Sequence, residues 1–168
     1  VECLRYAYEH GCDFGFEETC EGAVAGGHLE CVRYLCEEGC FYSTHIAGVA
    51  CRHQHYDVLE YLLSKFRCSV ASAFSEIRDI EGLRILSDLI EATGIDDHYD
   101  RSAALTMYAS RGHLEFVQYL CSKGYEWGDS ACKKIAHYGH YDCLRYACEN
   151  GCPIDDMAMN SAIRGGHF

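Results

Sequence analysis

Cysteine and histidine, the residue types that most often bind zinc or carry thiol redox chemistry, occur close together along this chain. The stretch Gly26–Cys40, GGHLECVRYLCEEGC, holds three cysteines and a histidine, and Gly139–Cys152 repeats it as GHYDCLRYACENGC. In the first stretch, Cys36 and Cys40 would place two thiols near one helix end, as a metal or redox site requires. A motif that recurs is either a repeated site or a repeated piece of scaffold.

Histidine positions give the period of the repetition. Intervals of 27, 58, 27 and 27 residues separate His28, His55, His113, His140 and His167. The interval of 58 residues contains one degenerate copy, near residues 69–100, in which Asp79 takes the place of the histidine. Extra residues before Gly94 predict a longer second helix in that copy. The chain therefore holds about six copies of a sequence unit, called a copy below, of about 27 residues.

Each copy predicts two short helices joined by a Gly-His turn. In one second helix Leu29, Val32 and Leu35 share an apolar face, and Gly39 stands where helices commonly end with positive φ. First helices are expected at Glu18–Ala25, Ala104–Ser110 and Ser130–His137. One helix pair cannot bury its own apolar face and must stack on the next pair, so an all-α solenoid is predicted.

The Gly-His turn and the second helix resemble ankyrin repeats. The family's phrase is G-H-L-E-V-V-K-L-L-L-E-x-G-A; Gly27–Cys40 matches it position by position, and the match recurs in five of the six copies. The period near 27 rather than 33 residues, and the ETCE sequence at Glu18–Glu21 in place of T-P-L-H, depart from the family pattern. The resemblance implies a single array over residues 1–168, part of a longer chain. Its fold would be an α-solenoid of stacked helix-turn-helix repeats with β-hairpin fingers that are short or absent.

Alignment with ankyrin repeats places all 13 cysteines at positions that the family fills with apolar or small residues. We therefore expect reduced cysteines that pack as small hydrophobic residues, with no metal and no cofactor. A repeated zinc site is disfavoured because Tyr125 replaces Cys40, and Leu63 replaces Cys36, in other copies. Disulfides between successive copies are excluded, since stacked helices lie about 8–10 Å apart and a disulfide needs Cα atoms within about 7 Å. A disulfide between two cysteines of the same copy is not excluded.

Two further repeated residue types are expected to serve packing. The histidines would form the turns and hydrogen-bond backbone groups between copies. The tyrosines that replace a leucine of the family pattern are expected to be half-buried rather than to stack on bases. They are Tyr6, Tyr34, Tyr61, Tyr119 and Tyr146.

Composition disfavours several classes of function. The net charge of −12 opposes binding to nucleic-acid phosphates, and no apolar run reaches the roughly 20 residues that cross a membrane. No signal peptide is visible, so an intracellular, reducing compartment, the cytoplasm, is expected. With no Gly-rich phosphate loop and no third group to orient a Cys–His pair, the sequence predicts neither an enzyme nor a small-molecule substrate.

The expected function is a non-catalytic scaffold that binds another protein through variable residues of the first helices and loops. A structural subunit of a large macromolecular assembly is one alternative, and a zinc-binding or redox cysteine protein is another. Aromatic and basic residues are common at binding hot spots. Phe14, Phe41 and Trp127 could equally well pack one loop against the next. The candidate binding residues are Phe14, Phe16, Phe41, Tyr42, Arg52, His53, Ser110, Arg111, Trp127, Lys133, His137 and Tyr138.

Overall fold

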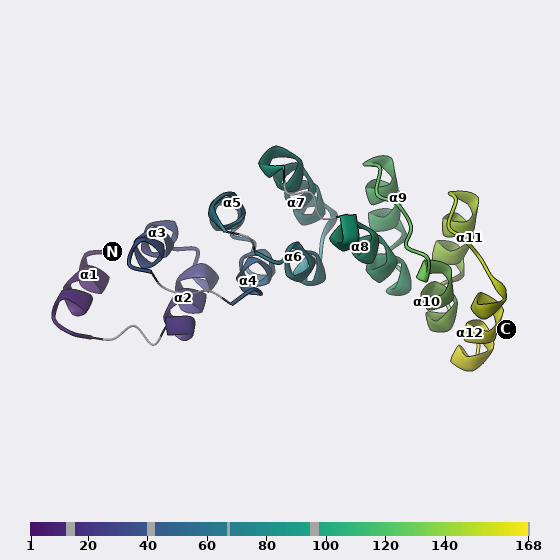
Figure 1. Ribbon diagram of the computed structural model, residues 1–168, viewed down its shortest axis with the longest axis horizontal. Helices are drawn as coiled ribbons and strands as arrows, with labels where there is room; N and C mark the ends of the chain where they lie inside the picture. Colours follow the sequence, from purple (N-terminus) through teal and green to yellow (C-terminus); the bar gives the residue numbers. More distant parts are fainter. Residues whose placement is uncertain (13–15, 40–42, 67, 95–97, 168) are drawn as a thin grey trace. The chain divides into compact units, whose positions relative to one another are not determined.

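Amphipathic segments of seven to fourteen residues form the regular structure of the chain. The computed structural model describes residues 1–12, 16–39, 43–66, 68–94 and 98–167, with the backbone alone at 16, 17 and 98–100. Over this part the protein has twelve α-helices and no β-strand (Figure 1), which confirms the predicted all-α class. The helices are α1 (Glu2–Glu9), α2 (Phe16–Ala25), α3 (Leu29–Glu37), α4 (Ile46–Arg52), α5 (Tyr56–Lys65), α6 (Val70–Glu76), α7 (Ile80–Thr93), α8 (His98–Ser110), α9 (Leu114–Ser122), α10 (Ala131–Tyr138), α11 (Tyr141–Glu149) and α12 (Asp156–Gly165). None of the described helices has the length and apolar character needed to cross a membrane.

Residues Val1–Ile95 form one compact unit, the N-terminal unit. Consecutive helices contact each other as pairs, α2 with α3, α4 with α5, and α6 with α7. First helices also contact one another, since α4 lies against both α2 and α6. Second helices do the same, since α5 lies against α3 and α7. The side chains buried in this unit include Val32, Leu35, Val58, Leu59, Leu62, Leu83 and Leu86.

Residues Asp96–Phe168 form a second compact unit, the C-terminal unit. Here α8 pairs with α9 and α10 pairs with α11, while α10 contacts both α8 and α12 and α11 contacts α9. Its buried side chains include Leu105, Tyr108, Val117, Leu120 and Ile135. Within each unit, the core is therefore built from the apolar positions that recur from copy to copy.

The degenerate copy has the longer second helix that its sequence predicts. Its α7 has 14 residues, against 9 in α3 and in α9. Asp79, which stands in the histidine position, is the N-cap of α7, and its side chain accepts a 2.7 Å hydrogen bond from the backbone N–H of Gly82. The aspartate therefore starts the helix by side-chain capping.

The first helices differ from the prediction in where they begin and end. Helix α8 begins at His98 instead of Ala104, because no glycine or proline interrupts the segment between them. The additional turns carry Arg101, whose guanidinium carbon lies 5.5 Å from the ring centre of Tyr125. Helix α10 covers Ala131–Tyr138 instead of Ser130–His137, with Ser130 as its N-cap, and α2 begins at Phe16 instead of Glu18.

The repeated histidines stand at the start of second helices. His28, His55, His113 and His140 are the N-cap residues of α3, α5, α9 and α11, with nearly the same backbone angles. The ring Nε2 of His55 lies 3.0 Å from the carbonyl oxygen of Ala25 in the preceding copy. This hydrogen bond confirms, for His55, the predicted link between copies.

The glycine of the Gly-His turn lies against the histidine ring of the next copy. A Cβ atom on Gly27 would lie 2.5 Å from Nδ1 of His55, and one on Gly112 would lie 2.6 Å from Nδ1 of His140. Both glycines also have positive φ, 68° and 80°. A side chain is disfavoured at these two positions for a steric and a conformational reason.

In the part of the chain that the structure describes, no histidine of the next copy packs against the turn at Gln54. It holds the place of Gly27 in its own copy and, among the described residues, is the one non-glycine residue with positive φ, 61°. The copy that follows carries Asp79 instead of a histidine, and the side-chain Nε2 of Gln54 donates a 3.4 Å hydrogen bond to Oδ2 of Asp79. At this turn, both the glycine and the histidine that would pack on it are replaced by other residues.

Candidate functional site

Four of the sequence candidates fall where side chains are not described. Phe14, Phe41 and Tyr42 lie outside the described residues. Phe16 is the first residue of α2, and only its backbone is described. These four candidates stay predictions from the sequence.

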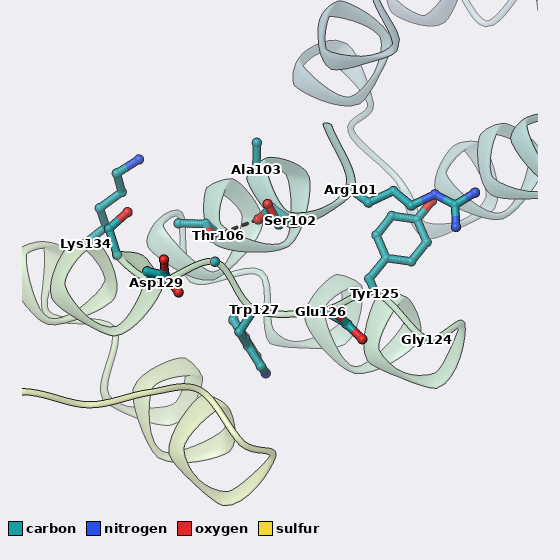
Figure 2. Close-up of a pocket in the computed structure, with 12 residues that line it drawn as sticks. Arg101, Ser102, Ala103, Thr106, Gly124, Tyr125, Glu126, Trp127, Asp129 and Lys134 are labelled. Atoms are coloured by element: carbon teal, nitrogen blue, oxygen red, sulfur yellow. Dashed lines mark hydrogen bonds between the residues drawn. The ribbon is translucent and has the colours of Figure 1, made fainter. Parts of the chain in front are cut away.

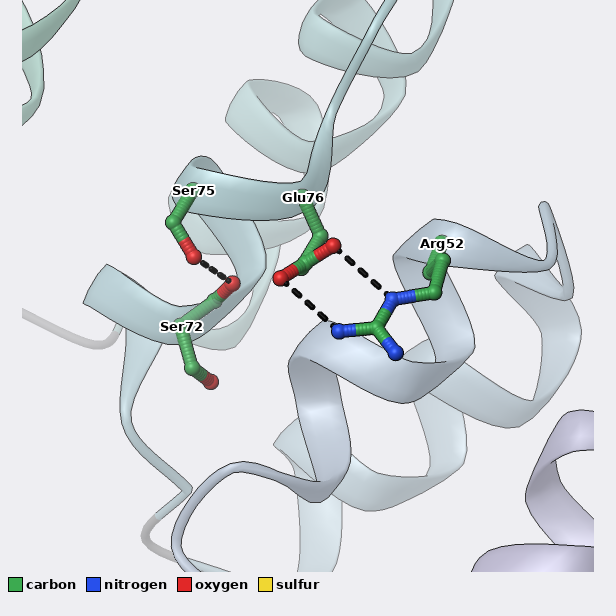
Figure 3. A network of polar contacts seen from close by, with 4 residues as sticks. All are labelled: Arg52, Ser72, Ser75 and Glu76. Atoms are coloured by element: carbon green, nitrogen blue, oxygen red, sulfur yellow. Dashed lines mark hydrogen bonds and ion pairs between the residues drawn. The ribbon is translucent and has the colours of Figure 1, made fainter.

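Arg52 is paired within the chain. At the end of α4, its Nε and Nη2 donate hydrogen bonds of 2.9 and 3.0 Å to the carboxylate of Glu76 on α6 (Figure 3). The hydrogen bonds to Glu76 raise the pKa of Arg52. This bidentate contact joins two consecutive first helices, so Arg52 is engaged in the scaffold. The neighbouring candidate His53, the C-cap of α4, is exposed.

Ser110 and Arg111 lie at the end of α8 and in the turn that follows. The hydroxyl of Ser110 donates a 2.9 Å hydrogen bond to the carbonyl oxygen of Met107, one turn earlier in the same helix. Ser110 is half-buried, whereas Arg111 is exposed. The hydroxyl of Ser110 therefore serves its own helix.

A pocket of about 550 Å³ lies between α8, the segment 124–130 and α10 (Figure 2). Arg101, Ser102 and Thr106 of α8 line it on one side and Lys134 of α10 on another. Trp127, a candidate from the sequence, also lines it and is half-buried. The same tryptophan borders a second pocket of about 390 Å³, so it lies at the junction of two pockets.

Two buried hydrogen-bond donors at these pockets have no partner within the described part of the protein. They are the indole Nε1 of Trp127 and the Nε of Arg101. Buried polar groups are normally paired, and leaving one unpaired costs about 1–3 kcal/mol. A carbonyl or carboxylate oxygen of a bound molecule would satisfy such a donor. Figure 2 shows the side chains of Arg101 and Trp127 pointing in different directions, and both donor atoms are buried, so a partner would reach them only after the side chains move.

Helix α10 presents an exposed face beside this pocket. Lys133 and His137 are four residues apart, as are Lys134 and Tyr138, so the two pairs form adjacent rows on the helix. All four side chains are exposed, Tyr138 by 58%. The rings of His137 and Tyr138 meet edge to face with centres 5.2 Å apart. We call Trp127, Lys133, Lys134, His137 and Tyr138 the α10 surface.

Arginines cover the tyrosines of the following copy in the N-terminal unit. The guanidinium carbon of Arg5 lies 5.5 Å from the ring centre of Tyr34, and that of Arg33 lies 5.3 Å from that of Tyr61. Tyr34 is buried and Tyr61 is half-buried, as are the tyrosines at positions 119 and 146. The packing role predicted for these tyrosines is confirmed, but it is wrong for Tyr6, which is 64% exposed.

The cysteines are less uniform than predicted. Cys3, Cys12 and Cys148 are exposed, because an apolar position of the repeat pattern is buried only where another element covers it. Cys20 is disulfide-bonded, so the prediction of reduced cysteines is wrong there. The buried cysteines are Cys20, Cys51, Cys132, Cys143 and Cys152. Among the described residues, no group of three or more histidine, cysteine, aspartate or glutamate side chains is placed to hold a metal ion.

We expect Cys51 in the folded protein to react with iodoacetamide at pH 8 at least about a hundredfold more slowly than Cys3, because the thiolate is the reactive form. Burial, and then the nearby charge of Glu76, raise the pKa of Cys51 to about 12, whereas Cys3 is exposed. Site-resolved mass spectrometry would measure both rates, and in urea they should become equal. Equal rates in the folded protein would contradict this burial.

The raised pKa of Cys51 also makes the stability of the folded protein depend on pH. Cys51 holds its proton more tightly in the folded protein than in the unfolded chain, where the pKa is near 9.0. Its contribution to stability is therefore complete below about pH 9 and is lost as the pH rises toward about 12.

Comparison with known proteins adds no relative. No family model, no curated protein and no solved structure matches the chain. The resemblance to ankyrin repeats therefore rests on the residues of the Gly-His turn and the second helix.

Proposed function

We propose that the protein is a non-catalytic scaffold that binds another protein and is built as an ankyrin-type α-solenoid. Within each unit, consecutive helix pairs contact one another, and the residues that recur in each copy serve turns and packing. Binding is then assigned to residues that do not recur. The observation that carries the proposal is the α10 surface, where exposed basic and aromatic side chains adjoin a pocket with unpaired donors.

The chemistry of the α10 surface indicates what a partner must offer. Tyrosine, tryptophan and basic side chains are enriched among the residues that dominate protein interfaces. Lys133 and Lys134 place two positive charges on a chain with a net charge of −12. The unpaired N–H groups of Trp127 and Arg101 need acceptor oxygens. A partner segment with backbone carbonyls and a carboxylate fits all three features.

The raised pKa values of the cysteine thiols support a non-catalytic function. Burial raises the pKa of Cys51 to about 12 and of Cys68 to about 11, and it also raises those of Cys121, Cys132, Cys143 and Cys152. A cysteine nucleophile requires a lowered pKa, because the thiolate is the attacking species. These cysteines therefore lack the activation that nucleophilic catalysis needs. The intracellular location is part of the same proposal and rests on the sequence.

The proposal is tested by affinity capture with the full chain as bait. We expect the double variant Lys133→Glu/Tyr138→Ala to recover the specific partner at least about tenfold less than the original protein, because both side chains are exposed hot-spot types. The matched control is Tyr141→Ala, which removes a tyrosine that is 69% exposed on α11, outside the α10 surface. Equal recovery by the double variant and the control would refute the proposed site.

A structural role in a larger assembly is the second candidate. It is favoured by apolar side chains exposed on α12, where Met159 is 65% and Ile163 is 56% exposed. The two residues are four apart and share one side of the helix. This second role would be supported if substitutions of Met159 and Ile163 reduced the recovery of the partner while substitutions of Lys133 and Tyr138 did not.

A further inference from the structure

Two buried sulfur atoms of the C-terminal unit lie unusually close together. The Sγ atoms of Cys132 on α10 and Cys152, which follows α11, are 2.6 Å apart. The two residues are only 1% and 5% exposed. Two thiol sulfur atoms in van der Waals contact would lie farther apart, whereas a disulfide bond is about 2.05 Å long, so these two free thiols are within reach of a covalent bond. A third sulfur, of Cys148 at the end of α11, lies 4.0 Å from that of Cys132.

The spacing of these three cysteines occurs a second time in the chain. Cys20, Cys36 and Cys40 follow one another at the same intervals of 16 and 4 residues as Cys132, Cys148 and Cys152. Cys20, the counterpart of Cys132, is disulfide-bonded. At this first-helix position the other copies carry Ala47, Ala71, Leu105 and Met159. Both copies that have the first-helix cysteine therefore also have the other two.

We propose that Cys132, Cys148 and Cys152 form a thiol oxidation site in which a small disulfide compound, such as glutathione disulfide, converts Cys132 and Cys152 into a disulfide. The exposed Cys148 reacts first, because both members of the final pair are buried. Burial also raises the pKa of Cys132 and of Cys152, which leaves few thiolates on either for direct attack on an oxidant. The site is thus a buried pair with one accessible thiol beside it.

The reaction proceeds by three thiol–disulfide exchanges. The thiolate of Cys148 attacks glutathione disulfide, forms a mixed disulfide and releases one glutathione, which takes up a proton. The thiolate of Cys132 then attacks the Cys148 sulfur and releases the second glutathione. Finally, Cys152 attacks the Cys132 sulfur, and Cys148 leaves as a thiol. In total, two protein thiols lose two electrons and two protons, which end on two glutathione molecules.

The resulting disulfide would fasten α10 to the segment that follows α11. Asn150 and Gly151, next to Cys152, line the 390 Å³ pocket together with Trp127. A covalent link at Cys152 would therefore fix one wall of that pocket and the helix that carries the α10 surface. The inference does not depend on the proposed binding function, since it rests on the three sulfur atoms.

The test is disulfide mapping of the full chain after exposure to glutathione disulfide at pH 8 and blocking of free thiols. Digestion with trypsin and with a protease that cleaves after glutamate releases Cys132 in fragment 127–133. It also separates Cys148, in fragment 146–149, from Cys152, in fragment 150–164. We expect fragment 127–133 linked to fragment 150–164. Cys121, whose copy has Leu105 and Tyr125 at the other two positions, should stay blocked as a free thiol and serves as the internal control.

Two variants separate the steps. Cys148→Ser should slow formation of the linked fragments by about tenfold and leave their final yield unchanged. Cys152→Ser should abolish the link to fragment 150–164, and it should remove a rise in the thermal unfolding midpoint of about 5 °C that oxidation gives the original protein. Free Cys152 in the oxidised original protein, or a stable end product linked at Cys148, would overturn the proposed pair. An unchanged rate in Cys148→Ser would overturn the first step.

Discussion

Replacing Gly112 with alanine is expected to lower the free energy of unfolding of the C-terminal unit by about 2–3 kcal/mol. Roughly 1–2 kcal/mol arises because Gly112 has a φ of 80°, a left-handed conformation that costs an alanine free energy. The remainder arises because the new Cβ would lie 2.6 Å from Nδ1 of His140, so the imidazole must move and lose its contact with the preceding copy.

Urea unfolding followed by tryptophan fluorescence measures this effect, because Trp127 is the one tryptophan in the sequence and lies in the C-terminal unit. The matched control is Gln54→Gly at the equivalent turn, where Asp79 replaces the covering histidine. Circular dichroism would follow this control, which should leave stability unchanged or raise it by up to about 1 kcal/mol. A Gly112→Ala protein within about 0.5 kcal/mol of the original would contradict the packing of His140 on this turn.

Replacing Tyr108 with alanine is expected to have the largest effect on stability, a loss of about 3–5 kcal/mol. Tyr108 is fully buried in α8, and its ring packs edge to face against Phe116 with centres 4.9 Å apart. Removing the ring leaves a cavity that the surrounding helices can fill only in part. The same fluorescence measurement applies.

The control for Tyr108 is Tyr141→Ala, which removes a tyrosine that is 69% exposed on α11 of the same unit. We expect it to change stability by no more than about 0.5 kcal/mol. Similar losses for the two variants would mean that Tyr108 does not fill the core between α8 and α9.

The elements of the fold could be predicted where local chemistry decides them. The spacing of Leu29, Val32 and Leu35 predicts the second helix, and the additional residues before Gly94 predict the longer α7. The start of α8 at His98 could not be predicted, because the turns before Ala104 lack the apolar repeat. The likeness among copies shows where a residue stands in its copy but gives no information on such insertions.

Pairings between copies were harder to predict than the helices. The hydrogen bonds from Arg52 to Glu76 join residues 24 positions apart whose side chains are both long and flexible. Sequence position alone cannot show that an exposed arginine is already engaged in this way. The prediction that His55 would bond to a neighbouring copy succeeded because the histidine recurs at the same place in the turn before the second helix.

The candidate site was predicted only in part. Trp127, Lys133, His137 and Tyr138 stand out in the sequence as aromatic or basic residues that do not recur, and the structure brings them to α10 and the segment before it. Arg101 was missed, because it joins the pocket only through the unpredicted first turns of α8. In the sequence, Arg101 is marked only by its positive charge next to Ser102, in a stretch without a clear apolar repeat.

The most direct test of the central claim is the affinity of the α10 surface for the captured protein. Isothermal titration of that protein into the original chain, into Lys133→Glu/Tyr138→Ala and into Tyr141→Ala gives three dissociation constants. We predict that the double variant raises Kd at least about tenfold and that Tyr141→Ala leaves it unchanged. An unchanged Kd for the double variant, with folding verified by circular dichroism, would contradict the claim that the residues of α10 that do not recur carry the binding.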